Sequence, residues 1–396
     1  MRQGRLMDRS RLLEGLTEAQ REAVTHVEGP LLILAGPGSG KTRVVTHRIA
    51  NLLCEGIPDR RILALTFTNK AAQEMKERVA ALVPGSRVWV GTFHRFAAQM
   101  LRRYAQVVGL EPNYTIYDKD QSLRALRTVL GRTKLDLGQH TPDQVANAIS
   151  WAKSRLIGPD AFEPRRGSEL GDIVKTVYRL YQRQLLQSNA VDFDDLLFHL
   201  ATILKTEPEI RKELDERYQF VMVDEYQDTN LVQYAIARAL SIDHPNLAVT
   251  GDPDQSIYGW RGANLQNILD FERDYPKVKV VRLERNYRST KRILRVADAL
   301  IRHNVRRKQK ELYTHNDEGA PVRLRTYVDQ DAEARDIAQR IASAVRENRR
   351  RPADFAIFYR VNALSRAFET ALQQQGIPYQ VVNGVAFFQR KEVKDV

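Results

Sequence analysis

The chain has 396 residues, of which 43% are apolar and 28% charged, so it is long enough for two or three domains with real hydrophobic cores. A formal net charge of +13 is consistent with a polyanionic partner, and the single cysteine, Cys54, excludes both an intramolecular disulfide framework and a cysteine-rich zinc site. The opening residues, MRQGRLMDRSRLL, lack the apolar core of a signal peptide, and no apolar run approaches the length of a membrane span, so we expect a cytoplasmic protein.

Short apolar runs recur along the chain, and each precedes a helical pattern. They are LLILA (31–35), RILALTF (61–67), RVWVGTF (87–93), FVMVDE (220–225) and NLAVTGD (246–252). Continuous apolar strands that lead into helices are typical of a parallel sheet covered on both faces. The predicted fold class is therefore α/β.

Two departures from this rhythm indicate domain limits. The section 110–205 contains helical patterns such as VKTVYRLYQRQLLQ and few strand candidates, which predicts a helical insertion. A second series of strand candidates begins near 279 with KVVRLERN, PVRLRTYV, ADFAIFYR and PYQVVNG. We therefore expect a first domain made of 1–109 and 206–278, the insertion over 110–205, and the start of a second α/β domain over 279–396, which we expect to be incomplete.

A phosphate-binding loop follows the first strand candidate. LLILAGPGSGKT combines an apolar strand, a glycine-rich turn and the start of a helical pattern, which is the context that a P-loop requires. Its glycines let backbone N–H groups surround a phosphate at the positive end of a helix. We expect Lys41 to reach the β- and γ-phosphates and the Thr42 hydroxyl to bind Mg²⁺. The predicted nucleotide-binding residues here are Ala35 (in place of the first glycine of the P-loop pattern), Gly36, Pro37, Gly38, Ser39, Gly40, Lys41 and Thr42.

The segment FVMVDEYQD supplies the acidic partner of a P-loop. Its apolar strand would deliver Asp224 to the carboxyl edge of the sheet, where the carboxylate can hold Mg²⁺. Glu225 beside it can polarise the attacking water as a general base. ATP or a related nucleoside triphosphate, with Mg²⁺, is therefore the first predicted ligand.

Two further segments flank the nucleotide motifs in the sequence. Gln20, in LTEAQREAV, could read the edge of adenine or be an ordinary exposed helix residue. Tyr287, in RLERNYRST, could stack on a base or belong to a core, and Arg288 could neutralise γ-phosphate charge. Residue type alone leaves these alternatives open.

The segment GDPDQSIYGWRGA (251–263) combines polar and aromatic groups at short spacing. Gln255 suits a phosphate, whereas Tyr258 and Trp260 suit the flat faces of nucleic-acid bases, although each ring could also be an ordinary core residue. Stacking on bases tolerates any sequence, so this segment could connect a nucleotide to a single strand.

Taken together and in this order, these segments resemble the UvrD/Rep/PcrA group of superfamily 1 DNA helicases. The resemblance covers residues 16–396 and rests on LTEAQREAV, AGPGSGKT, LALTFTNKAAQEM, VGTFHRFA, VDFDDLL, VDEYQDTN, VTGDPDQSIYGWRGA, LERNYRST and FAIFYRVNALSR. It implies two RecA-like motor domains, ATP and Mg²⁺ as cofactors, and 3′→5′ movement on single-stranded DNA and at duplex junctions, in DNA repair or replication restart.

The resemblance also implies a role for each matching residue. The catalytic residues would be Lys41, Asp224, Glu225, Gln255 as γ-phosphate sensor, and Arg288. Further nucleotide contacts would come from Gln20, Arg43 and Tyr287. The DNA contacts would be Phe67 and Phe193 along the path of the bases, Thr92 and His94 on the strand backbone, Tyr258 and Trp260 on the bases with Arg261 in support, and Arg360 from the second domain.

Some features of the family are missing from the sequence. Its later KGLE-like and TRA-like segments do not occur, so we expect a C-terminally truncated chain whose own ATP hydrolysis is weak. Three interpretations follow: a DNA helicase and translocase, the helicase part of a recombination helicase–nuclease, or a fragment that binds ATP and single-stranded DNA without unwinding.

Overall fold

A computed structural model describes residues 9–133, 135–305 and 307–382 of the chain. The chain divides into two compact units, Met1–Ala320 and Pro321–Val396. The first unit contains the parallel sheet and every nucleotide motif, and the second contains the segment FAIFYRVNALSR.

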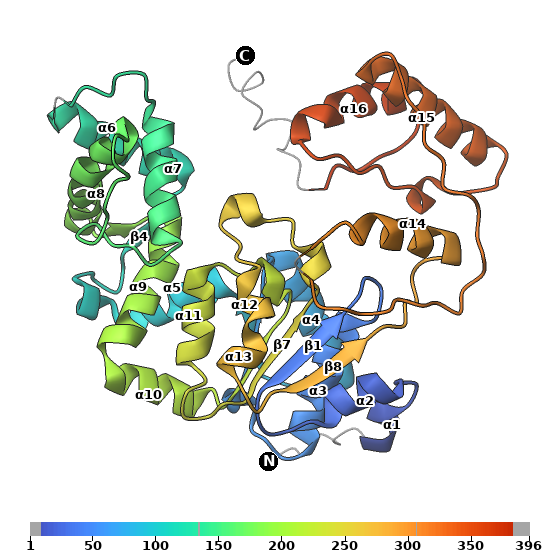
Figure 1. The fold of residues 1–396 in the computed structure, drawn as a ribbon, viewed down its shortest axis with the longest axis horizontal. Helices are drawn as coiled ribbons and strands as arrows, with labels where there is room; N and C mark the ends of the chain where they lie inside the picture. Colours follow the sequence, from blue (N-terminus) through green and yellow to red (C-terminus); the bar gives the residue numbers. More distant parts are fainter. Residues whose placement is uncertain (1–8, 134, 306, 383–396) are drawn as a thin grey trace. The chain divides into compact units, whose positions relative to one another are not determined.

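The centre of the first unit is a six-stranded sheet in which all neighbouring strands are parallel (Figure 1). In spatial order the strands are β3 (Trp89–Thr92), β2 (Ile62–Thr66), β6 (Phe220–Val223), β7 (Leu247–Gly251), β1 (Leu31–Ala35) and β8 (Lys279–Leu283). The central strands are buried along their whole length, as expected for a sheet covered on both faces. The predicted α/β class and the five strand candidates before residue 253 are confirmed.

Helices cover both faces of this sheet. On one face lie α1 (Arg9–Leu13), α2 (Glu18–Thr25), α3 (Lys41–Cys54) and α4 (Asn69–Leu82), and on the other lie α5 (Phe93–Arg103), α9 (Phe193–Thr206) and α11 (Leu231–Ala239). Successive side chains of a strand point to opposite faces of the sheet. Leu31 and Ile33 of β1 therefore belong to the hydrophobic cluster on the α3 side, here called the first cluster, and Leu32 and Leu34 belong to the cluster on the α5 side. This alternation gives the sheet two cores.

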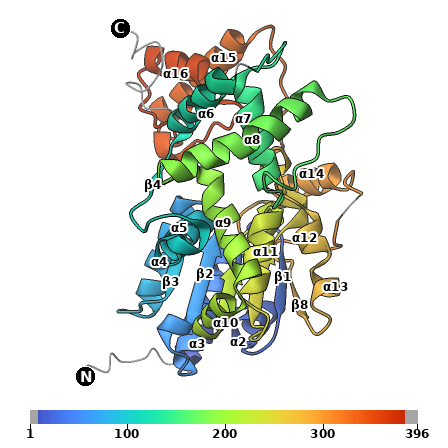
Figure 2. The ribbon, with the colours of Figure 1, turned by 90° about the vertical axis from the view of Figure 1, so that its left-hand side faces the viewer.

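The predicted helical insertion has a hydrophobic cluster of its own. It consists of α6 (Lys119–Thr133), α7 (Pro142–Lys153), α8 (Glu169–Gln187) and two short parallel strands, β4 (Thr115–Ile116) and β5 (Ala190–Val191). α9, which leads away from α8 (Figure 2), lies within the predicted limits of the insertion except for Thr206. Its residues Leu196, Leu200 and Ile203 nevertheless pack in the cluster on the sheet. The insertion therefore packs by itself only as far as the start of α9.

The strand β8 differs from the expected organisation. The sequence predicts that it opens the second strand series, but it pairs with β1 from Leu31↔Lys279 to Ala35↔Leu283. Val281 and Leu283 are buried in the first cluster, while the alternate residues are more exposed, as in an edge strand. The first sheet therefore extends to residue 283, because β8 completes the hydrogen bonding of β1.

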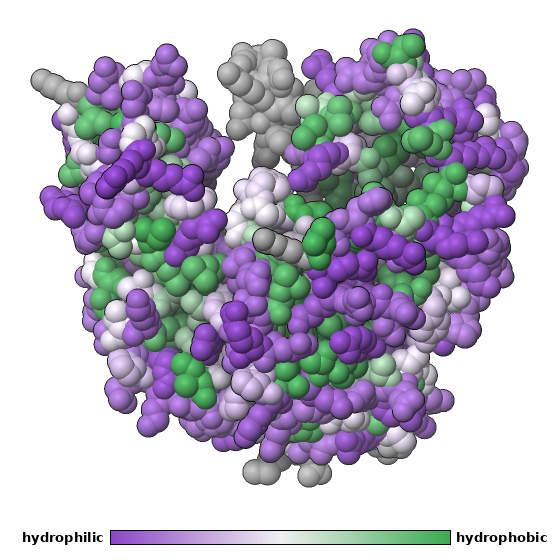
Figure 3. Space-filling model, viewed as in Figure 1, coloured by the Kyte–Doolittle hydropathy of each residue, from purple (hydrophilic) through white to green (hydrophobic). Residues whose placement is uncertain are grey.

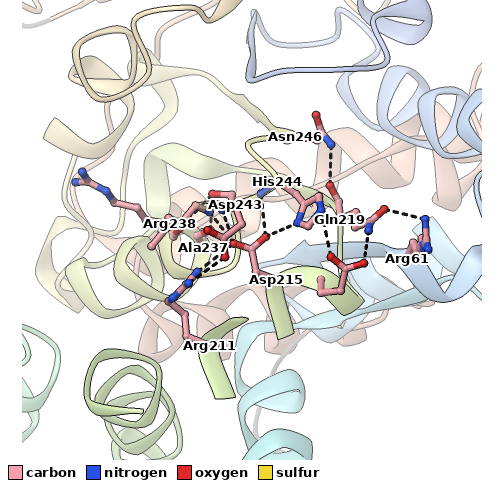
Figure 4. Close-up of polar contacts among 12 residues, drawn as sticks. Arg61, Arg211, Asp215, Gln219, Ala237, Arg238, Asp243, His244 and Asn246 are labelled. Carbon is pink, nitrogen blue, oxygen red and sulfur yellow. Dashed lines mark hydrogen bonds and ion pairs between the residues drawn. The ribbon is translucent and has the colours of Figure 1, made fainter. Parts of the chain in front are cut away.

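The amino ends of the strands are held by a polar network around Asp215, on α10 (Pro208–Arg217) (Figure 4). The buried Asp215 carboxylate accepts hydrogen bonds from three successive backbone N–H groups in the loop 242–244 and pairs with Arg211 at 3.3 Å. Asn246, just before β7, donates to the carbonyl of Gln219, just before β6, at 3.0 Å. These bonds fix the sheet at the edge opposite the nucleotide motifs.

Short elements connect the rest of the first unit. They are the 3₁₀ turns η1 (Asp59–Arg61), η2 (Ala105–Val108), η3 (Tyr226–Asp228), η4 (Pro253–Gln255) and η5 (Gly259–Arg261), and the helices α12 (Gln266–Leu269), α13 (Phe271–Asp274) and α14 (Lys291–Ile301). Three of the turns, η3 to η5, follow the carboxyl ends of β6 and β7.

The second unit contains α15 (Gln330–Arg346), α16 (Ser365–Gln374), η6 (Pro352–Asp354) and η7 (Asn362–Leu364), and its two helices share a small cluster. The sequence predicts strands at PVRLRTYV, ADFAIFYR and PYQVVNG, but no strand is present between 321 and 382, and the end of the last candidate lies outside the described residues. Leu324 and Phe358 are almost fully exposed. An extended segment becomes a strand only beside a second backbone, and the described residues supply none.

No helix in the described part of the chain is long and apolar enough to cross a bilayer. The face drawn in Figure 3 is largely hydrophilic, with hydrophobic side chains gathered in patches between the polar ones. This distribution agrees with the 28% of charged residues in the sequence.

Candidate nucleotide site and nucleic-acid interface

The predicted nucleotide residues of the first unit lie along the carboxyl edge of the sheet. β1 leads into the P-loop, β6 into Asp224 and Glu225, β7 into the loop that carries Gln255, and β8 into Tyr287 and Arg288. In parallel sheets this edge is where ligands bind, because successive loops converge there.

The P-loop has the backbone conformation that its glycines allow. Gly38 and Gly40 have φ values of 65° and 90°, which residues with a Cβ rarely adopt. The Ser39 hydroxyl donates to the carbonyl of Gly36 at 2.8 Å and closes the loop on itself. Gly40 is the N-cap of α3 and offers no side chain to the first turn, whereas α2 and α9 begin with reciprocal side-chain caps. The start of α3 is therefore suited to an anion.

Lys41, which follows β1, contacts side chains from the loops after two other strands, β6 and β7. Its Nζ lies 3.3 Å from Oε2 of Glu225 and donates to Oε1 of Gln255 at 3.5 Å. These three predicted catalytic residues are therefore adjacent in space. In the sequence, Glu225 is 184 positions after Lys41, and Gln255 is farther still. A phosphate that met Lys41 would also lie beside Glu225 and Gln255.

Asp224 and Glu225 have unusual environments. Burial, and then the neighbouring Glu225, raise the pKa of Asp224 to about 7. A divalent cation would favour the charged carboxylate, so the buried Asp224, together with the Thr42 hydroxyl in the first turn of α3, fits the oxygen ligands that Mg²⁺ takes. Glu225 has a φ of 53°, a strained value for a residue with a side chain, and strained residues cluster at functional sites.

Sequence reasoning did not single out Gln227, which connects the two acidic loops. Its Nε2 donates to Oε2 of Glu225 at 2.9 Å, and its Oε1 accepts the backbone N–H of Asp252 at 3.0 Å. A Cβ at Gly251 would come within 2.6 Å of this Oε1, so the glycine leaves space for the contact. The signal in the sequence was the amide in VDEYQD, two residues after Glu225.

Gln20 is buried and already has partners. Its Nε2 donates to the carbonyl of Ser39 at 3.0 Å, and its Oε1 accepts the N–H of Thr17 at 3.2 Å as part of the cap of α2. Its amide therefore holds the P-loop backbone at Ser39. The exposed-helix alternative for this residue does not apply, and the adenine contact remains a prediction.

Asn286, a second residue that sequence reasoning missed, fixes the loop after β8 onto the P-loop. The buried side chain donates to the carbonyl of Pro37 at 2.6 Å and accepts the N–H of Arg288 at 2.9 Å. The N–H of Tyr287 donates to the carbonyl of Gly38 at 2.9 Å. The backbone of Arg288 therefore lies beside the P-loop.

The remaining two predicted nucleotide contacts, Tyr287 and Arg43, are exposed. The ring of Tyr287 is 43% exposed and lies under the guanidinium of Arg285, at 4.7 Å from its carbon to the ring centre. Arg43 is exposed in the first turn of α3. Both positions leave the side chain accessible to a ligand.

Aromatic pairs line the same edge beyond the nucleotide residues. The rings of Phe67 and Tyr258 stack with centroids 5.2 Å apart, and those of His94 and Phe193 stack at 4.2 Å. Trp260 is 63% exposed. The core alternative therefore does not hold for Trp260, and exposed aromatic faces of this kind suit stacking on bases.

A buried ion-pair cluster lies at the start of α9, next to Phe193 in the sequence. Lys153, at the end of α7, lies 2.6 Å from a carboxylate oxygen of Asp192 and 2.7 Å from one of Asp195. The side chain of Phe193, between these two acids, is 57% exposed. The cluster joins the insertion to the sheet at the point where the ring is presented, and sequence reasoning did not identify Lys153.

Comparison with known protein families matches both parts of the chain. Residues 16–276 match the UvrD/REP helicase N-terminal domain, and residues 281–396 match the UvrD-like helicase C-terminal domain. The chain belongs to the UvrD/Rep/PcrA family of superfamily 1 helicases. The fold of its first unit is therefore the RecA-like P-loop fold of that family.

Individual relatives agree with this assignment. The chain is 43% identical, over 98% of its length, to the ATP-dependent DNA helicase PcrA of Bacillus subtilis (strain 168), and equally identical, over 97%, to the proteins of the same name from Leuconostoc citreum and Staphylococcus aureus (strain Mu50 / ATCC 700699). It covers 53%, 52% and 53% of these relatives. The chain thus spans about half the length of the curated relatives it matches.

Thr92 and His94 lie at the start of α5. The Thr92 hydroxyl caps this helix by accepting the N–H of Arg95 at 3.2 Å. Burial lowers the pKa of His94 to about 4, so its imidazole is neutral at physiological pH. Next to Thr92 a pocket of about 290 Å³ is lined in part by Lys76 and Arg95, two basic residues that sequence reasoning did not name.

The remaining two predicted DNA contacts are Arg261 and Arg360. Arg261 belongs to η5, but its side chain lies outside the described residues. Arg360 is exposed in the second unit, just before η7. Their roles remain predictions.

Proposed function

We propose that this chain carries the nucleotide-hydrolysing motor of an ATP-dependent DNA helicase that moves on single-stranded DNA. The observation that supports this most is the meeting of Lys41 with Glu225 and Gln255 at one point of the P-loop. The relatives named above are ATP-dependent DNA helicases. Unwinding, its 3′→5′ direction and a cytoplasmic role in DNA repair or replication restart are part of the proposal.

The proposed chemistry follows from the positions of the side chains. Backbone N–H groups of the P-loop and Lys41 bind the phosphates, and Thr42 with Asp224 holds Mg²⁺, which neutralises phosphate charge when it is bound. Glu225 accepts a proton from the attacking water, and Gln255 contacts the γ-phosphate. Arg288 stabilises the charge on the transferred phosphoryl group.

The DNA side of the proposal rests on the exposed rings. Phe193 and Trp260 present faces on which any base can stack, and Tyr258, which stacks on Phe67, is close to Trp260 in the sequence. Only two residues lie between Gln255 and Tyr258, and Asp252, the N-cap of the η4 turn, is bonded to Gln255. A change at the γ-phosphate can therefore reach the aromatic residues through a short, bonded segment.

The domain limits also enter as a proposal. We place the insertion from 110 to the start of α9, assign β8, through residue 283, to the sheet of the first motor domain, and let the second motor domain follow β8. The separate cluster of α6 to α8 supports the insertion.

Steady-state ATP hydrolysis tests the proposal, measured on the 396-residue chain with and without oligo-dT. We expect oligo-dT to raise the rate and Lys41→Ala to abolish it, because the lysine binds the phosphates. Binding of mant-ATP, followed by fluorescence, serves as an independent readout. A chain that binds no mant-ATP, or whose hydrolysis ignores both oligo-dT and Lys41→Ala, would contradict the proposed function.

A further inference from the structure

Residues 307–313, here called the strap, follow α14 and return to the loop after β8. The N–H of Tyr313 donates to the carbonyl of Glu284 at 3.1 Å, and the N–H of Asn286 donates to the carbonyl of Tyr313 at 2.7 Å. These reciprocal bonds fix the strap next to the residues that hold the P-loop. Leu312 packs so closely on Gly36 that a Cβ there would overlap it.

The strap inserts a buried cation between two carboxylates. The Lys310 side chain is 2% exposed, and its Nζ bonds to Oδ1 of Asp252 and, at 2.7 Å, to Oδ2 of Asp254. Arg307 adds a second contact to Asp254 at 3.0 Å. The two acids are 0% and 6% exposed, so they need this positive charge: buried carboxylates are costly unless they are paired.

One of these carboxylates, Asp252, also holds Gln255. Oδ2 of Asp252 accepts the Nε2 of Gln255 at 2.6 Å, and the backbone carbonyl of Asp252 accepts the N–H of Gln255 at 2.9 Å. The amide oxygen of Gln255 then faces Nζ of Lys41 at 3.5 Å. A continuous line of contacts runs from the strap through Asp252 and Gln255 to the P-loop lysine.

We propose that Lys310 is a positioning residue that sets Gln255 for the γ-phosphate. Neutralised by Lys310, Asp252 directs its free oxygen to the Gln255 amide and orients the opposite end of that amide toward the phosphate site. The inference rests on the proposed function, since it takes Gln255 as the γ-phosphate sensor. Its consequence is specific: Lys310 contributes to the preference for ATP over ADP, because ADP has no γ-phosphate.

The test compares binding of mant-ATP and mant-ADP to the 396-residue chain and four variants. Lys310→Met removes the charge, and Lys310→Arg keeps it. Asp254→Asn combined with Lys310→Met removes one charge of each sign and keeps the cluster balanced. Lys308→Met is the matched control, because Lys308 lies in the same strap but pairs with Glu272 at 3.1 Å. Thermal melting of each variant reports its folding.

We expect Lys310→Met to lower the ratio of mant-ATP to mant-ADP affinity by about tenfold, as for the loss of a hydrogen bond to a charged group. Lys310→Arg should restore most of the ratio, and Lys308→Met should leave it unchanged. If Lys310→Met does not fold, the charge-balanced double variant decides by the same ratio.

Two results separate the possible failures. If the unmodified chain binds neither probe, the proposed function is wrong. If it binds both and the ratio survives in Lys310→Met or in the double variant, or if Lys308→Met lowers the ratio as much, Lys310 is only structural and the positioning role is overturned.

Discussion

The phosphate side and the aromatic side of the sheet's carboxyl edge are built in opposite ways. Around Lys41, polar groups are buried and bonded to one another, as in the contacts of Gln227 with Glu225 and of Asn286 with Pro37. Around Trp260, apolar rings are exposed to solvent. Phosphate chemistry needs groups fixed within fractions of an ångström, whereas stacking needs an accessible face and tolerates any base.

The largest effect is expected from changing one acid on the phosphate side. Glu225→Gln should lower ATP hydrolysis by about 10²–10⁴-fold, because a general base contributes that much, while mant-ATP binding persists. Rates with and without oligo-dT, beside binding curves, measure the split. Glu216→Gln, which removes a carboxylate paired with His244 at the opposite edge of the sheet, is the control and should leave the rate unchanged. Parallel loss of binding and hydrolysis would show a structural role for Glu225.

On the aromatic side the expected effect is smaller and of another kind. Trp260→Ala should weaken oligo-dT binding by about tenfold or more, since a stacked base contributes about 1–3 kcal/mol. DNA-stimulated hydrolysis should fall with it, and hydrolysis without DNA should change little. Trp151→Ala removes another exposed tryptophan, in the insertion, as a comparison. Equal losses with and without DNA would argue against a coupling role for Trp260.

The smallest expected effect concerns His94, whose neutral ring stacks on Phe193. Its pKa falls from 6.5 to about 4 on folding, so the stability it contributes is present above pH 6.5 and is lost as the pH falls toward 4. Allowing for solvent screening, the unmodified chain should lose about 1 kcal/mol more of its free energy of unfolding than His94→Gln between pH 7.5 and pH 5. Urea denaturation at both pH values measures this.

The exposed histidine variant His303→Gln provides the reference for that experiment. It should follow the pH dependence of the unmodified chain. If His94→Gln does so too, the ring is not desolvated beneath Phe193, and the stacked pair would be looser than the structure describes.

Prediction from the sequence succeeded where local pattern and chemistry agree. The continuous apolar runs predicted five of the six parallel strands, and the P-loop pattern placed Lys41 at the start of α3. It did less well where pairing partners decide. KVVRLERN has the pattern of a strand, but only its contact with β1 shows to which sheet it belongs. In the same way, PVRLRTYV has strand composition without a partner strand in the second unit.

The sequence by itself determined the fold class, the family and the residue types of the nucleotide site, because periodicity and motif spacing are local properties of the chain. The tertiary structure decided how those residues act together. The motifs that contain Gln227 and Asn286 do not show what these side chains contact, and Lys310 lies in no motif; their roles arise from contacts between residues 25 to 249 positions apart. Such contacts depend on which loops the sheet order brings together, and no local pattern encodes that order.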